Sequence, residues 1–172
     1  MSARPRVYLA GPGVFRPDAL AYADGLRMLC ARHGLAGVFP LDGDAAADAP
    51  AIFRHNLALI DTCAGVLAEL TPFRGLAADP GTAFEIGYAY ARGLPVVAWT
   101  ADHRVYRERL VAAGQAWPDG RGGWIDAVGL AVEDFGLVDN LMPVCAARAV
   151  EADPGPALAR LAAALGLPAA AT

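Results

Sequence analysis

The chain has 172 residues and a mass of 17.8 kDa, which suits one domain and leaves little room for two. Hydrophobic residues make up 56% of the sequence and charged residues 19%, so the chain can bury a substantial core and is not disordered throughout. A net charge of −4 and a pI near 5.2 argue against nucleic-acid binding, which requires a basic face.

Missing residue types narrow the chemistry further. All 14 basic residues are arginine, so Schiff-base chemistry and a phosphate-loop lysine are excluded. The single serine, Ser2, stands at the N-terminus, which argues against a serine hydrolase. Three cysteines far apart, without a CxxC pair, are typical of a reduced protein without a zinc site. No run approaches the roughly 18 apolar residues of a membrane span, so we expect a cytoplasmic protein that does not enter membranes.

Short apolar runs alternate with helical patterns along the chain. In chain order, the pattern predicts a strand at 7–10, a helix at 17–33, a strand at 37–39, a helix at 50–62, a strand at 65–70, a helix at 81–92 and a strand at 95–99. The glycine- and tryptophan-rich segment 114–136 is predicted to be irregular, and a closing helix is predicted at 156–166.

This alternation predicts an α/β fold: a doubly wound parallel sheet of about five strands with helices on both faces. Without an internal repeat or a linker, residues 1–172 are expected to form a single domain with its core at about 6–144. In open parallel sheets, ligands bind beyond the carboxyl ends of the strands. The loops to consider are therefore 10–16, 40–48, 70–80 and 100–104.

The first of these loops is glycine-rich and runs from Ala10 to Phe15. One interpretation is a tight turn between strand and helix. The other is that Gly11 lets a ligand approach the backbone, with Tyr8 supplying a hydroxyl and Phe15 a stacking face. The loop lacks the spacing of the common nucleotide-binding motifs, so both interpretations stay open.

The third loop leads into the helix at 81–92 and carries two carboxylates. Asp79 before Pro80 is typical of a helix N-cap, which is compatible with a second role in binding. Glu85 is the one acidic residue between Thr82 and Thr100, on an otherwise apolar helix. A buried carboxylate is costly unless it is used or satisfied, so Glu85 is a candidate catalytic group; a surface glutamate is the alternative.

A late stretch, 133–142, contains Asn140, one of only two asparagines in the chain, the other being Asn56. An amide combines a donor and an acceptor, which suits a binding site. By contrast, His33, His55 and His103 lack ligand spacing and are interpreted as structural or surface residues. The arginines of one short segment are expected to form a solvated face: Arg104, Arg107 and Arg109.

Four stretches together resemble one family. The opening A-G-P-x-x-F, the loop L-T-P-F-R-G, the helix D-P-G-T-x-F-E-x-G-Y-A and the stretch E-D-F-G…N-L-M are similar to those of nucleoside 2-deoxyribosyltransferases. The resemblance extends from Arg6 to about Val144, and the block from Asp79 to Glu85 is its most specific part.

The resemblance implies a flavodoxin-like (Rossmann-like) fold and a homodimer or larger homo-oligomer with shared active sites. It also implies the reaction: a 2-deoxyribosyl group passes between nucleobases through a covalent glycosyl-glutamate, with retention and without a metal or cofactor. The partners are then a 2′-deoxynucleoside and a free nucleobase. By the same resemblance Glu85 is the nucleophile, Tyr8 orients it, Asp79 holds the sugar hydroxyls and Asn140 comes from a neighbouring subunit. The implied substrate-binding residues are Gly11, Phe15, Asn56, Asn140 and Met142.

The sequence departs from the family pattern at Asn56, which aligns approximately with a base-contacting aspartate. An amide cannot donate a proton to a leaving base as a carboxyl group can, so base preference is not carried over. Two other functions remain open. One is hydrolysis of 2′-deoxynucleoside 5′-monophosphates, which Asp79 disfavours because a carboxylate repels a phosphate. The other is a non-catalytic nucleotide-binding module, which has no need for a nucleophile.

Overall fold

The computed structural model describes residues 3–43 and 48–168, so Ser2 lies outside the described residues. The sheet is made of β1 (Arg6–Ala10), β2 (Ala36–Val38), β3 (Gly65–Glu69), β4 (Val96–Trp99) and β7 (Val150–Glu151). The strand order is β2-β1-β3-β4-β7, and every neighbouring pair is parallel. This is the flavodoxin-like order, so the predicted fold class is confirmed.

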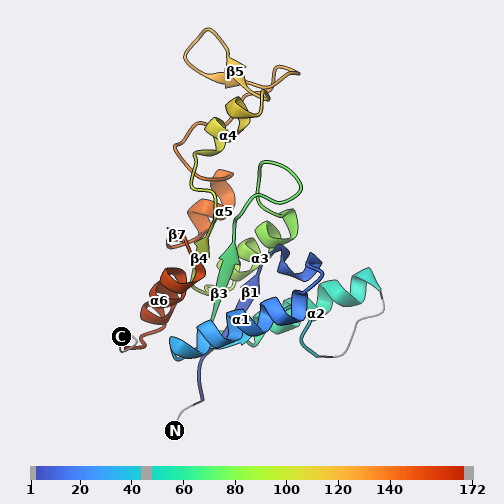
Figure 1. Cartoon of the computed structure of the whole chain (residues 1–172), viewed down its shortest axis with the longest axis vertical. Coiled ribbons are helices and arrows are strands. Elements are labelled where there is room, and N and C mark those ends of the chain that lie inside the picture. The colour runs from blue at the N-terminus through green and yellow to red at the C-terminus, as the bar shows by residue number, and fades with distance from the viewer. Residues whose placement is uncertain (1–2, 44–47, 169–172) are drawn as a thin grey trace.

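Helices cover both faces of the sheet (Figure 1). One face packs against α1 (Ala19–Arg32) and α6 (Pro154–Ala164), and the other against α2 (Ala49–Asp61) and α3 (Pro80–Ala91). Side chains alternate along β1, so Val7 and Leu9 pack in the first core while Tyr8 and Ala10 pack in the second. The alternation therefore places the side chain of Tyr8 on the face that α3 covers.

Neither α4 (Tyr106–Ala112) nor α5 (Leu141–Ala146) nor β7 was predicted by residue. The helices have 7 and 6 residues, and β7 has 2, so none is long enough to display a clear period. The prediction of an irregular segment at 114–136 was wrong in part, because Trp117–Pro118 (β5) and Trp124–Ile125 (β6) pair as a short antiparallel ladder. The closing helix begins and ends two residues earlier than predicted, since Pro154 occupies its first turn.

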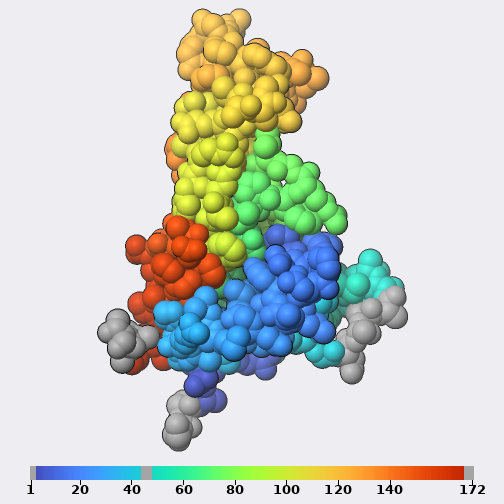
Figure 2. Space-filling view, viewed as in Figure 1, coloured from blue at the N-terminus to red at the C-terminus, as the bar shows by residue number. Residues whose placement is uncertain are grey.

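The segment from α4 to β6 forms an arm that projects beyond the carboxyl ends of the strands (Figure 1). In the space-filling view it extends upward from the body formed by the sheet and its helices (Figure 2). Arg104, just before the arm, pairs with Asp102, and Arg107, on α4, pairs with Asp134; both arginines retain solvent exposure. The expectation that Arg109 is also solvated was wrong: this side chain is 1% exposed.

Candidate active site

A hydrogen bond joins the strand β1 to the helix α3. The Tyr8 hydroxyl donates to Oε1 of Glu85 at 2.6 Å, and Tyr8 itself is fully buried. Glu85 is half-buried on the second turn of α3, which starts at the carboxyl end of the sheet. In the described part of the chain no hydrogen bond reaches Oε2, so Tyr8 fixes the carboxylate while one oxygen stays free to react.

Burial dominates the electrostatics of this pair. It raises the pKa of Glu85 to about 7, helped by the negative charge of Asp79 and opposed by the hydrogen bond from Tyr8. Burial, followed by the charge of Glu85, raises the pKa of the Tyr8 phenol, which therefore stays protonated and acts as the donor. A carboxylate that titrates near neutral pH and is held by a fixed donor is typical of a catalytic group.

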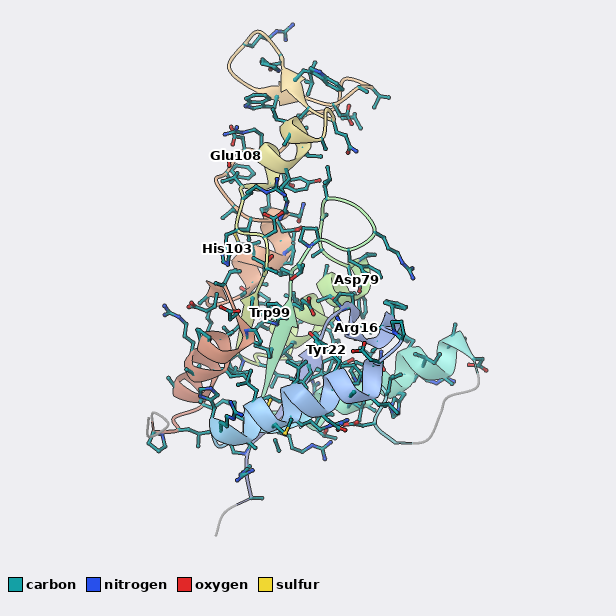
Figure 3. All side chains as sticks on the ribbon, viewed as in Figure 1. Arg16, Tyr22, Asp79, Trp99, His103 and Glu108 are labelled. Carbon is teal, nitrogen blue, oxygen red and sulfur yellow. The ribbon has the colours of Figure 1, made fainter. Side chains whose placement is uncertain are left out.

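Asp79 begins α3 as its N-cap, as predicted. Oδ2 accepts hydrogen bonds from the backbone N–H of Thr82 at 2.9 Å and from its hydroxyl at 3.0 Å. Both bonds use the same oxygen, so among the described residues Oδ1 has no donor to satisfy it. Asp79 lies at the same end of the sheet as Trp99, the last residue of β4 (Figure 3). The cap therefore leaves one carboxylate oxygen of Asp79 free at this end of the sheet, and the charge of Asp79 raises the pKa of Glu85.

The glycine-rich loop forms a short 3-10 helix, η1 (Pro12–Phe15). A Cβ atom on Gly11 would lie 3.0 Å from Cβ of Glu69. A Cβ atom on Gly13 would lie 2.5 Å from the ring of Tyr22. The packing of the protein's own side chains thus explains these glycines, which favours the tight-turn interpretation of the loop.

Phe15 is 55% exposed at the end of this loop. Its ring stacks on that of Phe73 at 5.2 Å between centroids. The guanidinium of Arg74 lies 4.8 Å from the Phe15 centroid and 4.7 Å from that of Phe73, and Arg74 adopts a positive φ of 54°. Phe15 is therefore exposed but already packed in an aromatic cluster that the sequence did not reveal, and its stacking on a ligand stays a prediction.

Asn56 lies on α2, and its side-chain oxygen is buried without a hydrogen-bond donor among the described residues. A buried acceptor without a donor costs free energy, which a ligand N–H or O–H would recover. This unsatisfied acceptor keeps Asn56 a candidate binding residue, although its oxygen is buried and borders none of the cavities described below.

Asn140 begins α5 as its N-cap, and its Oδ1 accepts from the backbone N–H of Met142 at 2.9 Å. Its Nδ2 donates to Glu133 at 2.7 Å, so one N–H of the amide remains available. Asn140 and the exposed Met142 border a cavity of about 560 Å³ between α3 and α5. On α3 this cavity is lined by Ala83, Ile86, Gly87 and Tyr90.

The helix separates this cavity from the nucleophile candidate. Residues of an α-helix are about 100° apart around its axis, so Ala83, Gly87 and Tyr90 face away from Glu85. Within one chain, the structure brings together Tyr8, Glu85 and Asp79 and leaves Asn140 on the other side of α3.

Two polar pairs were missed by sequence reasoning. Tyr22 donates to Glu69 at 2.9 Å, beside a cavity of about 440 Å³ that Phe15 also lines. Burial raises the pKa of Glu69, and the hydrogen bond from Tyr22 opposes that shift. Arg109 pairs with Asp139 in the interior. Tyr22 and Glu69 are 47 positions apart and Arg109 and Asp139 are 30 apart, so no local sequence pattern indicates either pair. The position of Glu69 at the end of a strand was the one signal that could have marked it as a site residue.

Residues 3–43 and 48–168 contain no group of three or more His, Cys, Asp or Glu side chains arranged to hold a metal ion. The helices of this same part of the chain are too short or too polar to cross a lipid bilayer.

Comparison with known proteins identifies relatives. The chain is 38% identical to an uncharacterised protein of Schizosaccharomyces pombe, in an alignment that covers 80% of this chain and 74% of that protein. A structure of a 2-desoxiribosyltransferase from Leishmania mexicana matches with a TM-score of 0.75 and 33% identity, over 92% of this chain and 97% of that one. A conserved protein from Enterococcus faecalis V583 shares the fold, with a TM-score of 0.59 and 23% identity over 92% of this chain and 98% of that one.

A family model described as nucleoside 2-deoxyribosyltransferase matches residues 7–142, a range that contains Tyr8, Asp79, Glu85, Asn140 and Met142. This match covers most of the chain and agrees with the structural similarity to the Leishmania mexicana enzyme. The chain therefore belongs to the nucleoside 2-deoxyribosyltransferase family.

Proposed function

We propose that the protein transfers a 2-deoxyribosyl group between nucleobases of 2′-deoxynucleosides, with Glu85 as the nucleophile. The observation that carries this proposal is the pair formed by Tyr8 and Glu85, a half-buried carboxylate held by a buried phenol at the carboxyl end of the sheet. Family membership supports the same reaction class.

In the first step, Oε2 of ionised Glu85 attacks C1′ of the sugar. The C1′–N bond to the base breaks, its electron pair leaves with the base, and the base takes up a proton. Tyr8 donates to Oε1 throughout, which holds the carboxylate in the attacking orientation. A C1′ centre without a 2′-hydroxyl readily develops cationic character, so a carboxylate suffices to trap it as an ester.

In the second step, a nitrogen of another base attacks C1′ from the face that the first base left. The ester bond breaks, its electron pair returns to Glu85, and the incoming base loses a proton. Two inversions at C1′ produce net retention of configuration. Attack by water instead of a base gives hydrolysis through the same intermediate.

Asp79 is proposed to bind the sugar hydroxyls through Oδ1, the oxygen that its helix cap leaves free. Asn56 is proposed to accept a hydrogen bond from the base, Phe15 to stack on it, and Gly11 to hold the loop beside the base. We further propose that Asn140 and Met142 complete the site of a neighbouring subunit in a homo-oligomer. The position of Asn140 on the far side of α3 from its own Glu85 supports this arrangement.

The test is product analysis of the purified protein with a 2′-deoxynucleoside, with and without a second free base. A new nucleoside containing the second base supports the transferase. Free base and deoxyribose alone indicate an N-glycosidase, and the absence of any product favours a binding module. A lower KM for 5′-monophosphates than for nucleosides would favour the alternative of a monophosphate hydrolase.

A further inference from the structure

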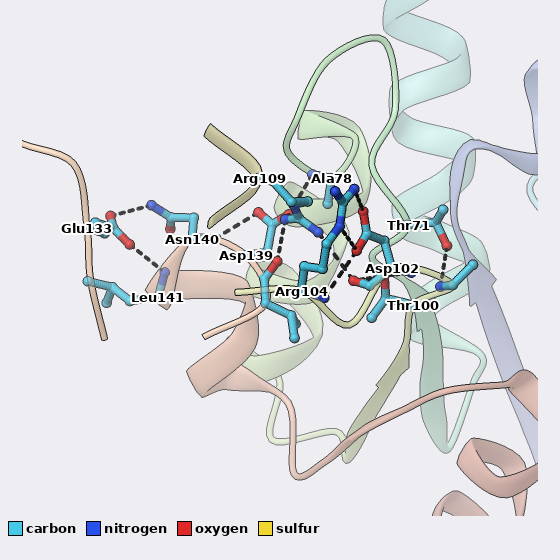
Figure 4. A network of polar contacts seen from close by, with 12 residues as sticks. Thr71, Ala78, Thr100, Asp102, Arg104, Arg109, Glu133, Asp139, Asn140 and Leu141 are labelled. Carbon is cyan, nitrogen blue, oxygen red and sulfur yellow. Dashed lines mark hydrogen bonds and ion pairs between the residues drawn. The ribbon is translucent and has the colours of Figure 1, made fainter. Parts of the chain in front are cut away.

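A buried ion pair lies where the arm meets the body of the protein. Nη2 of Arg109, on α4, is 3.3 Å from Oδ2 of Asp139, and the two side chains are 1% and 3% exposed (Figure 4). Arg109 also donates to the backbone carbonyls of Asp102, at 3.3 Å, and Val138. The guanidinium is therefore held by the chain on both sides of the arm.

The two carboxylate oxygens of Asp139 accept hydrogen bonds from two different segments of the candidate site. Oδ2 accepts from the backbone N–H of Ala78 at 2.8 Å, and Oδ1 accepts from the backbone N–H of Asn140 at 2.8 Å. Ala78 directly precedes Asp79, the N-cap of α3, and Asn140 is the N-cap of α5. One carboxylate thus joins two helix starts that are 61 positions apart in the sequence.

Stability alone is a weak explanation for this arrangement. Desolvating two charges costs several kcal/mol each, and well-packed apolar side chains of similar volume often replace a buried ion pair without loss of stability. What an apolar pair cannot do is accept hydrogen bonds from two backbone N–H groups at fixed positions. The carboxylate of Asp139 provides that geometry, and Arg109 compensates its charge.

We propose that Asp139 is a positioning residue: together with Arg109 it holds Asp79 in its own site and Asn140 in the site that Asn140 completes in the neighbouring subunit. The inference rests on the proposed function, because Asp79 and Asn140 are the residues proposed there to bind the substrate. A misplacement of about 1 Å in a group that orients the substrate can cost on the order of 100-fold in rate. Loss of the Asp139 contacts is thus expected to weaken recognition of the sugar hydroxyls specifically.

The experiment compares a 2′-deoxynucleoside with the 2′,3′-dideoxynucleoside of the same base. The ratio of their kcat/KM values measures how well the protein recognises the 3′-hydroxyl, and a general loss of folded protein leaves this ratio unchanged. In Asp139→Asn, the amide has only one oxygen to accept hydrogen bonds, so Ala78 or Asn140 loses its partner. The double variant Arg109→Met/Asp139→Asn leaves no unpaired buried charge, which guards against unfolding.

A matched control is available on the same arm. Arg107 and Asp134 form an ion pair of similar length, 3.2 Å, but both side chains are partly exposed and contact neither helix start. Asp134→Asn is expected to leave the ratio unchanged, because surface ion pairs contribute little.

We expect both Asp139 variants to lower the ratio by about tenfold or more, with the double variant still unfolding in one cooperative transition. An unchanged ratio in a folded variant, whether or not both kcat/KM values fall, would overturn the positioning role. If the wild type does not release base from either nucleoside, the proposed function fails first. If the wild type discriminates and the folded Asp139 variants discriminate equally well, only the positioning role fails.

Discussion

The hydroxyl of Tyr8 donates to Oε1 of Glu85 at 2.6 Å although 77 positions separate the two residues in the sequence. Tyr8 lies in the interior of the sheet, so its phenol has little freedom to move. This contact fixes the orientation of the carboxylate and opposes the rise of its pKa that burial causes.

Replacing Glu85 by glutamine should abolish transfer, because an amide cannot form the glycosyl ester. Loss of a covalent nucleophile normally costs orders of magnitude in kcat/KM. Activity above about a tenth of the wild type in Glu85→Gln or Glu85→Ala, measured as release of base, would contradict the assignment.

The same substitution should stabilise the protein at alkaline pH. The folded-state pKa of about 7 lies above the ordinary value of 4.5, so the folded state binds the proton more tightly than the unfolded chain. The free energy of unfolding of the wild type therefore falls as pH rises from 4.5 to 7. Above pH 7 we expect Glu85→Gln to be more stable by up to about 3 kcal/mol, and at pH 4 by nothing measurable. Urea unfolding of the wild type and of Glu85→Gln, at pH 4 and again above pH 7, measures this difference.

The activity of the wild type should depend on pH through the same group. Glu85 attacks only when ionised, so kcat/KM for a 2′-deoxynucleoside should rise with pH through a midpoint near 7. In Tyr8→Phe the hydrogen bond that lowers the pKa of Glu85 is lost, and the midpoint should move to higher pH. A midpoint that stays in place, or moves down, would show that this hydrogen bond does not control the ionisation.

Asp79→Ser is expected to change the substrate preference while keeping the fold. Serine is itself a good N-cap, so α3 should still begin at this position. Removal of a negative charge favours a dianionic phosphate, and we expect the kcat/KM of a 5′-monophosphate relative to its nucleoside to rise about tenfold or more. Asp79→Asn, which also caps helices and removes the charge, separates charge from side-chain size in the same assay.

Complementation tests whether Asn140 acts in trans. Glu85→Ala and Asn140→Ala are each expected to be inactive alone. After subunit exchange in a dimer, about a quarter of the sites should combine an intact Glu85 with an intact Asn140 from the partner, so activity reappears. A mixture that stays inactive, although exchange is demonstrated with tagged subunits, would place Asn140 in its own site or outside any site.

Four of the five strands of the sheet were predictable from the sequence, because they are short apolar runs that directly precede or follow helices with a clear period; β7, with 2 residues, was not. Tyr8, Asp79 and Glu85 were predicted as a group from the family resemblance, while the rule that ligands bind beyond the carboxyl ends of parallel strands drew attention to the loop that contains Asp79. Asp79 was identified as an N-cap from Pro80 alone, and the bond to Thr82 confirms it. The contact between Tyr8 and Glu85 required the side-chain alternation of β1, which the apolar run by itself does not indicate.

Other features depend on tertiary contacts that leave no local pattern. Arg109 stands between surface arginines and is buried only because Asp139, from a distant segment, compensates its charge. Glu69 ends a predicted strand, yet its pairing with Tyr22 depends on how α1 packs on the sheet. The glycine-rich loop was open to two interpretations, and the close approach of the Tyr22 ring to Gly13 favours the structural one.

The covalent intermediate is the central claim, and peptide mapping by mass spectrometry tests it most directly. The protein is incubated with a 2′-deoxynucleoside without acceptor base, quenched with acid during turnover, digested and analysed. We predict one deoxyribosyl group on the peptide that contains Glu85, with no such adduct in Glu85→Gln and less of it when a second base is added before quenching. Turnover with an unmodified Glu85 peptide, or with the adduct on another residue, would contradict the mechanism.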